Sequence, residues 1–401
     1  MSRVSSGIWI KIIAGIIVGL LVGAVATYFL YDYIRPQPSP EIEHIKIGVS
    51  YPLSGVVAYE GRHCLDGTLL AVKEINEAGG IGGRYMIELV VEDDKCDPTE
   101  GATIAEKFIT KDRVDIIVAS FCSAVTLAMA PVAEENDVLF VNANSIADSI
   151  TEQGWEWVFR VCDNSVKMSE ALIAALVNDV GWKEMAIITS DDAMGIGSAT
   201  AAKAEIEKYS GASVVAEYYI PRGTKDYYPY LTALKDMKPD GLILPMDAMD
   251  GAALINQYAE LGLRDVGIGI SGFGGFEGSE DFLELTGNNA EGLIDSTMYS
   301  PFIEPLNPRY EKVTNDFRSL YGYSPNKYAI RAYDSIKIIA DAIERANSIE
   351  PADVREALLE TSYTGPIGEN LTFDDKHQLH RIILIIEIVD GEHIVKFQKL
   401  V

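Results

Sequence analysis

Short apolar runs alternate with amphipathic segments of helical length along most of the chain after residue 44. The strand-like runs lie at 45–50, 86–92, 114–119, 138–141, 185–189, 213–219, 241–245 and 267–271. The helical patterns between them lie at 60–78, 99–110, 125–136, 165–179, 197–210, 227–236 and 249–261. Regular alternation of this kind predicts parallel sheets with helices on both faces, which is an α/β fold.

The alternation runs twice, once before about Arg160 and once from Glu184 onward. We therefore expect two similar lobes instead of one large sheet. The tail departs from this rhythm, with helical patterns at 307–320, 327–346 and 351–360, and then two strand-like runs on either side of Asp390-Gly391. An Asp-Gly pair between such runs predicts a hairpin, and we expect the tail to cross between the lobes and complete both sheets.

The first 34 residues predict a membrane anchor or a signal segment. Residues 12–30 contain no charged side chain, which meets the requirement of roughly 20 apolar residues for a bilayer span. Arg3 and Lys11 precede this run, so its amino side is expected in the cytoplasm and the rest of the chain outside. Ala24-Val25-Ala26 resembles a cleavage site, but cutting there would expose Tyr28 and Phe29 to water, which favours a retained anchor.

Residues 35–43 follow as a Pro-rich linker, which predicts a stiff spacer. The expected location is therefore the extracytoplasmic face of the membrane, or the periplasm or medium if the segment is cleaved. The formal charge of −27 excludes general nucleic-acid binding, which requires basic patches.

Two of the four cysteines follow apolar runs, and outside the cell they are expected to be oxidised where geometry allows. Cys96 and Cys122 can be bridged if their Cα atoms lie within about 7 Å of one another. Such a bridge would brace the loops at the strand ends. Cys64 and Cys162 remain, and free thiols are favoured over a second bridge.

No motif predicts an enzyme, a cofactor or a metal site. The pattern Gly-x-Gly-x-x-Gly at 267–272 lies inside a strand-like run and not between a strand and a helix, so a dinucleotide role is not expected. The five histidines show no metal-ligand spacing, and no nucleophile elbow is present.

Polar and aromatic residues do, however, follow the strands directly. An open α/β sheet binds its ligand at the carboxyl ends of its strands, so these loops predict a small-molecule site between the two lobes. The loops in question are 50–61, Ser123, 144–146, 191–194, Asp247 and 271–276.

Several stretches resemble the type I periplasmic binding proteins, specifically the branched-chain amino acid (Leu/Ile/Val) and amide group that feeds ABC importers. They are IKIGVSYPLSG, VKEINEAGGIGGR, VVEDDKCDP, FCSAVT, WVFRVCDN, NAEGLIDSTMYSP and YGYSPNKYAIRAYDSIKIIADAI, in the expected order. The resemblance implies a two-lobed clamshell with doubly wound sheets and three hinge crossovers. It places 44–160 plus 301–375 in lobe 1 and 163–299 plus 376–401 in lobe 2, and it implies the Cys96–Cys122 disulfide.

The resemblance also implies where a ligand would bind. Ser123, in the loop with Phe121 and Cys122, would hold a carboxylate through its hydroxyl and backbone amide, which stabilise an anion without a buried counter-ion. Asn144 and Ile146 fall on the next ligand positions, and Ile146 lacks the hydroxyl expected there.

The ammonium side departs from the family pattern. Where the family has an acidic partner, this chain has Ser271, and where an aromatic is expected in the first loop it has Glu60 beside Tyr59. The remaining positions of the expected pocket are held by Met194, Asp247, Phe273 and Tyr328.

We therefore expect Glu60 or Asp247 to face an amino or quaternary ammonium group of the ligand, because a buried carboxylate without a partner is costly. The alternative is that both side chains point to solvent at the rim of the cleft. The function predicted is that of an extracytoplasmic solute-binding protein that captures an amino acid or related amine or carboxylate and delivers it to ABC permease subunits. A ligand-sensing receptor ectodomain is the alternative.

Overall fold

The computed structural model describes residues 42–400 except 275, 277 and 278. It also describes a few positions between 9 and 27. Within this part of the chain, every helix is too short or too polar to cross a membrane. Much of the predicted anchor at 12–30, and the linker up to residue 41, lie outside the described residues.

The first sheet has five strands in the order β2-β1-β3-β4-β5. Their bounds are β1 (Glu43–Tyr51), β2 (Tyr85–Asp93), β3 (Ile116–Ala119), β4 (Leu139–Asn142) and β5 (Val158–Arg160). β1 pairs in parallel with β3, β3 with β4 and β4 with β5. Residues of β3 and β4 are buried throughout, as expected for parallel strands that are covered on both faces.

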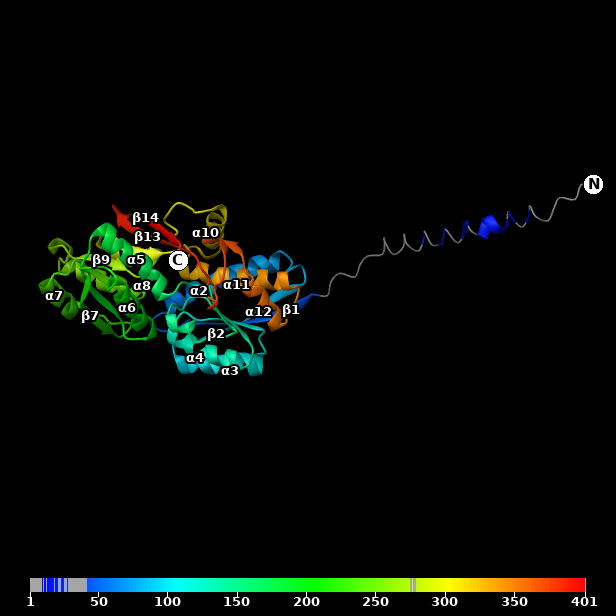
Figure 1. Cartoon of the computed structure of the whole chain (residues 1–401), viewed down its shortest axis with the longest axis horizontal. Helices are drawn as coiled ribbons and strands as arrows, with labels where there is room; N and C mark the ends of the chain where they lie inside the picture. The colour runs from blue at the N-terminus through cyan, green and yellow to red at the C-terminus, as the bar shows by residue number, and fades with distance from the viewer. Residues whose placement is uncertain are drawn as a thin grey trace, which may run out of the picture. The chain divides into compact units, whose positions relative to one another are not determined.

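Helices cover both faces of this sheet (Figure 1). One layer contains α2 (Ala58–Glu77), α11 (Lys327–Ala346) and α12 (Pro351–Leu359), and the other contains α3 (Pro98–Lys107) and α4 (Ser123–Glu134). α10 (Pro308–Tyr321) also contacts α2. α2 and α11 approach closely because Gly67 has no side chain: a Cβ there would lie 1.9 Å from the carbonyl oxygen of Ala329.

The second sheet has seven strands in the order β14-β13-β10-β9-β8-β6-β7. Their bounds are β6 (Glu184–Ser190), β7 (Ser213–Ile220), β8 (Gly241–Leu244), β9 (Gly269–Gly272), β10 (Leu293–Thr297), β13 (Ile382–Val389) and β14 (Glu392–Leu400). The predicted hairpin is present: Asp390 and Gly391 both have positive φ, and β13 pairs antiparallel with β14. β13 also pairs antiparallel with β10. The tail therefore extends the second sheet. The expectation that it also completes the first sheet is wrong for the described residues, because the tail contributes only an isolated bridge between Arg160 and Gln378 there.

Two apolar cores lie on the two faces of the second sheet. One involves α5 (Ser165–Ala175) and α6 (Ala193–Ile206), and the other α7 (Tyr228–Met237), α8 (Ala248–Glu260) and α9 (Glu280–Thr286). Trp182 packs against strand glycines, since a Cβ at Gly269 would lie 2.3 Å from its ring. The glycine pattern at 267–272 therefore serves packing within a strand. Short 3₁₀ or π turns complete the chain at η1 (Phe108–Asp112), η2 (Asp148–Ile150), η3 (Leu176–Val180), η4 (Arg264–Val266) and η5 (Gly287–Ala290).

The chain passes between the two sheets after β5, after β10 and again before β13. The small sheet of β11 (Tyr363–Gly365) and β12 (Gly368–Leu371) precedes the third passage. The first and third passages lie side by side, because Arg160 N donates to His377 O at 2.9 Å and Leu379 N donates to Arg160 O at 2.9 Å. The predicted two-lobed α/β architecture with parallel sheets is confirmed. The short strands β5 and β10 and the helix α9 were not predicted.

Candidate ligand-binding site

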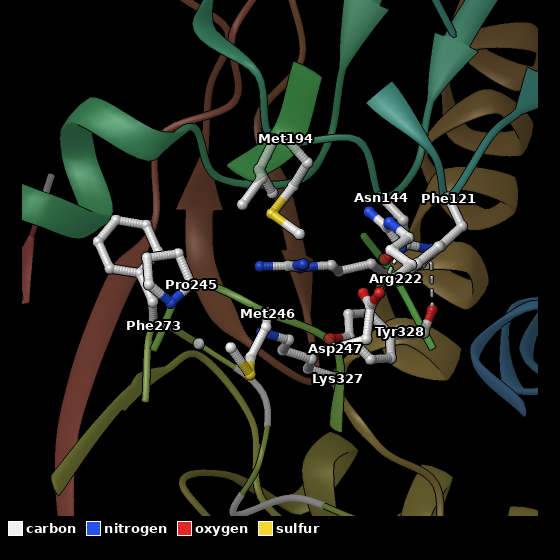
Figure 2. Close-up of a pocket in the computed structure, with 13 residues that line it drawn as sticks. Phe121, Asn144, Met194, Arg222, Pro245, Met246, Asp247, Phe273, Lys327 and Tyr328 are labelled. Atoms are coloured by element: carbon white, nitrogen blue, oxygen red, sulfur yellow. Dashed lines mark hydrogen bonds and ion pairs between the residues drawn. The ribbon is translucent and has the colours of Figure 1, made fainter. Parts of the chain in front are cut away.

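A cavity lies between the two sheets, at the carboxyl ends of their strands (Figure 2). It contains about 400 Å³ of empty space, open solvent included, of which about 30 Å³ is wide enough for the centre of a water molecule. Its lining comes from the first lobe, the second lobe and the start of α11. The lining residues are Phe121, Asn144, Ile146, Met194, Arg222, Pro245, Met246, Asp247, Phe273, Gly274, Lys327, Tyr328 and Arg331.

The strand-end positions identified in the sequence account for much of this lining. The predicted residues that the structure brings together here are Phe121, Asn144, Ile146, Met194, Asp247, Phe273 and Tyr328. The predicted residues that lie outside the lining are Tyr59, Glu60, Cys122, Ser123 and Ser271. Sequence reasoning missed three cationic residues that line the cavity, namely Arg222, Lys327 and Arg331.

Apolar side chains form much of the cavity wall. The rings of Phe121 and Tyr328 meet edge to face, with centroids 5.1 Å apart. The Asn144 amide lies beside them, and its Nδ2 donates to Tyr328 O at 3.2 Å (Figure 2). Asn144 Oδ1 is buried and has no hydrogen-bond donor among the described residues. An apolar ligand body would contact these rings, and a donor on the ligand would satisfy this oxygen.

Arg222 lies between two carboxylates of the second lobe. Its Nε is 2.5 Å from Asp192 Oδ2, and its Nη1 donates to Asp247 Oδ2. Burial opposes the charge of Arg222, but the carboxylates of Asp247 and Asp192 outweigh this effect and raise its pKa. The side chain follows β7 at a strand end, so the rule that identified the other loops would also have found it.

Asp247 is therefore not an isolated carboxylate, and neither predicted acidic residue lies at an exposed rim. Asp247 is 5% exposed and Glu60 is fully buried. Burial raises the pKa of Asp247, although Arg222 opposes this shift. The rim alternative for these two side chains is wrong, because the closely packed lobes cover both of them.

Glu60 differs from Asp247 in having no partner. It lies in the first turn of α2, and neither of its carboxyl oxygens has a hydrogen-bond partner in the described part of the chain. Burial and the negative charge of Asp247 raise the pKa of Glu60. Asp250 adds to this effect, whereas Arg222 opposes it. Glu60 is thus a buried acid close to Asp247 and Arg222, the ion pair that lines the cavity.

The Ser123 loop is braced as expected, but Ser123 itself is buried outside the cavity lining. The predicted disulfide joins Cys96 and Cys122, whose Cα atoms are 5.6 Å apart, while Cys64 and Cys162 are free and buried. Ser123 is 1% exposed, and its Oγ accepts a hydrogen bond from Ala147 N at 3.3 Å. Ser271, the other predicted serine, donates to the adjacent Gly272 carbonyl.

The start of α11 contributes two cations. Asn326 caps the helix by accepting hydrogen bonds from the backbone amides of Tyr328 and Ala329. Lys327 is 2% exposed, and its Nζ lies 5.0 Å from the centroid of the Tyr328 ring. One turn later, Arg331 Nη2 lies 2.9 Å from Asp163 Oδ2. Among the described residues, no group of His, Cys, Asp and Glu has a geometry suited to a metal ion.

Comparisons with known proteins agree with this architecture. A family model described as "Periplasmic binding protein" matches residues 44–392. The "Leucine-, isoleucine-, valine-, threonine-, and alanine-binding protein" of Pseudomonas aeruginosa is 28% identical over 338 residues, which cover 84% of this chain and 87% of that protein.

Two solved structures share the fold. The leucine-binding protein LivK of Thermotoga maritima has a TM-score of 0.79 and 25% identity, and the match covers 88% of this chain and 98% of that one. The branched-chain amino acid transporter substrate-binding protein LivJ of Streptococcus pneumoniae, in complex with isoleucine, has a TM-score of 0.79 and 24% identity. Its match covers 90% of this chain and 99% of that chain.

Proposed function

Since the chain belongs to the periplasmic binding protein family, we propose that it is an extracytoplasmic solute-binding protein of an ABC importer. The observation that carries this proposal is the cavity at the strand ends, lined by side chains of both lobes and of α11. A ligand there would contact both lobes at once, so its binding energy would favour their closed arrangement. Binding without chemical turnover is sufficient for this role.

The ligand we propose is an amino acid or a related compound with an amine and a carboxylate. Its support is twofold: the cavity combines apolar walls with charged groups, and the relative in Pseudomonas aeruginosa is a leucine-, isoleucine-, valine-, threonine- and alanine-binding protein. The narrow space favours a small ligand, whose entry requires the lobes to part or side chains to move.

Glu60 is the residue we assign to the ligand's amine. Asp247 already has a cationic partner in Arg222, whereas both oxygens of Glu60 lack a hydrogen-bond partner in the described part of the chain. An ammonium group beside Glu60 would meet the carboxyl groups of Glu60, Asp247 and Asp250 and a single cation, Arg222. Glu60 lies outside the cavity lining, so this contact requires its side chain to move.

The proposed partners are the ligand and the permease subunits that receive it from the closed protein. The proposed location is outside the cytoplasmic membrane, held there by the segment at 1–34 or released if that segment is cleaved. Cell fractionation with an antibody against the folded part would separate these two states.

A thermal-shift screen of amino acids, amides, betaines and small organic acids tests the binding function. A ligand that binds only the native state raises Tm as its concentration rises. At a ligand concentration of one hundred times Kd, the free energy of unfolding increases by about 2.7 kcal/mol. Hits would be measured by isothermal titration calorimetry, with the protein recovered and the ligand checked for chemical change. A screen in which no amine or carboxylate raises Tm would overturn the proposal.

A further inference from the structure

In the described part of the chain, the charged side chains that line the cavity are mainly cationic. Three lining residues are cationic, namely Arg222 from the second lobe and Lys327 and Arg331 from α11. The one carboxylate among the described lining residues is that of Asp247, and Arg222 pairs with it. The carboxylates of Asp192 and Asp163, which pair with Arg222 and Arg331, lie outside the lining. Arg222 and Arg331 therefore line the cavity, while their partners Asp192 and Asp163 lie outside the lining.

Arg222 keeps part of its hydrogen-bonding capacity. A guanidinium group has five N–H donors in a planar fork. Here Nε is used by Asp192 and Nη1 by Asp247, and Nη2 has no acceptor among the described residues. Because Arg222 lines the cavity, its Nη2 edge offers a donor pair to a bound group.

Lys327 is held against the opposite loop. A Cβ added to Gly274, in the loop after β9, would lie 2.9 Å from Lys327 Nζ, and both residues line the cavity. The ammonium group is thus buried between this loop and the Tyr328 ring. A lysine head group in a site of this kind is costly unless an anion or acceptors compensate it. Lys327 already has other partners, and because it lines the cavity a ligand carboxylate there would join these contacts.

Ser123 is placed less favourably for an anion. The residue is 1% exposed and lies outside the cavity lining. The lining residue from this loop is Phe121, which presents an apolar ring instead of a donor. A carboxylate in the cavity would therefore meet the cations before it met Ser123.

We propose that the ligand's carboxylate is held by Lys327 and the Nη2 edge of Arg222, and not by the Ser123 loop. This inference rests on the proposed solute-binding function and names a different anion site within the same cavity. It assigns the ligand to small monocarboxylates with an apolar or aromatic body that fits between Phe121, Tyr328 and Phe273. An amine on the same ligand would face Glu60.

A comparison of each acid with its amide isolates the contribution of the carboxylate to binding, because the rest of the ligand is unchanged. We would measure Kd by calorimetry for L-leucine against L-leucinamide and for benzoate against benzamide, with the wild type and with Lys327→Met, Lys327→Arg and Ser123→Ala. The wild type should bind the acid of a pair at least about 10-fold more tightly than the amide, as expected for a charge-assisted hydrogen bond. Lys327→Met should abolish this preference, whereas Lys327→Arg and Ser123→Ala should retain it.

Arg222→Lys provides a second test in which the buried carboxylates keep a cationic neighbour. It should reduce the preference for the acid, because lysine lacks the planar fork. If Ser123→Ala abolished the preference and Lys327→Met kept it, the anion site proposed here would be overturned while the solute-binding function stood. If no acid of either pair bound to the wild type, the proposed function for this ligand class would itself be overturned. Near-ultraviolet circular dichroism would establish that each variant is folded.

Discussion

The hydroxyl oxygens of Tyr59 and Ser279 lie 2.7 Å apart and join the two lobes. Tyr59 belongs to the first turn of α2 in the first lobe, and Ser279 is the N-cap of α9 in the second. The Ser279 hydroxyl also accepts from Phe282 N at 3.1 Å, so the contact is anchored in a helix end. A second contact lies nearby, because Ser324 N donates to Glu280 Oε2 at 3.1 Å. These bonds stabilise the arrangement in which the cleft is narrow.

Tyr59→Phe should weaken ligand binding by about 2- to 10-fold, because one hydrogen bond of about 1 kcal/mol between the lobes is lost. The loss should occur mainly as faster dissociation, since the bond forms when the lobes close. Stopped-flow kinetics with the best ligand from the screen would measure it. Tyr219→Phe, which removes an exposed bond to Glu217, is the matched control and should change nothing. Equal dissociation rates for Tyr59→Phe and wild type would contradict this role.

Removing the Cys96–Cys122 disulfide should lower the free energy of unfolding by roughly 3 to 4 kcal/mol, the value of the chain-entropy model for a loop of this length. Affinity should also fall, because the bridge braces the loop that carries Phe121. Urea unfolding of a Cys96→Ala/Cys122→Ala variant would measure the first effect. Reductant should destabilise the wild type and leave the variant unchanged; a response of the variant would mean that Cys64 and Cys162 are not both free thiols.

The two lobes could be predicted because β-branched runs alternate with helical patterns along the sequence. The short strands β5 and β10 were not predicted. β5 has three residues and β10 has five, and such runs resemble loops when read alone. The strand-end rule identified Phe121 and Met194 in the cavity wall, since parallel strands bring their carboxyl ends to one edge.

The cations were missed for a different reason. Arg222 follows β7, an edge strand whose end was not considered as part of the site. Lys327 stands at the start of a predicted helix, where a lysine usually faces solvent, and the packing of α11 against the second lobe cannot be deduced from local pattern. The pairing of Asp247 with Arg222 depends on side chains 25 residues apart that the fold brings together.

Glu60→Gln should stabilise the unliganded protein at neutral and mildly alkaline pH. The pKa of Glu60 is raised from 4.5 to about 8, so between these values the native protein retains a proton that the unfolded chain has lost. The wild type therefore loses stability as pH rises from about 4.5 to 8, and glutamine removes this loss. The advantage of the variant should be near zero at acid pH and exceed about 1.4 kcal/mol, the value of one pKa unit, at pH 8.

Urea unfolding at several pH values would check this difference. The charged or titratable groups that act on Glu60, or on which it acts, are Asp247, Asp250, Arg222, Tyr59 and Cys64, and all are present in both proteins. The difference between the two proteins therefore reports the titration of Glu60 together with its interaction with Asp247. Exposed Glu88→Gln is the matched control. A constant difference between Glu60→Gln and wild type at all pH values would mean that Glu60 is not a buried protonated acid.

Asp163→Asn should destabilise the protein strongly, because one carboxylate serves two buried guanidinium groups. Asp163 Oδ2 lies 2.9 Å from Arg331 Nη2, and Asp163 Oδ1 lies 3.6 Å from Arg381 Nε. Asp163 lies in the first passage between the sheets and Arg381 in the third. Met298, in the second, has its sulfur 3.1 Å from Arg331 Nε and 2.9 Å from Arg381 Nη1. The three passages thus meet at one buried charge group.

Loss of this carboxylate leaves two buried cations without their anion, a change that typically costs 3 to 5 kcal/mol. Asp341→Asn, which breaks the partly exposed pair with Arg345 on α11, should cost only about 0.5 kcal/mol. Urea unfolding would measure both variants. Small-angle scattering of Asp163→Asn should also show a change in the separation of the lobes, since Asp163 joins the passages about which they move. A variant that unfolded like wild type would mean that the arginines are compensated by their backbone and sulfur contacts alone. A variant that lost stability without any change in scattering would restrict Asp163 to a structural role and remove it from the control of closure.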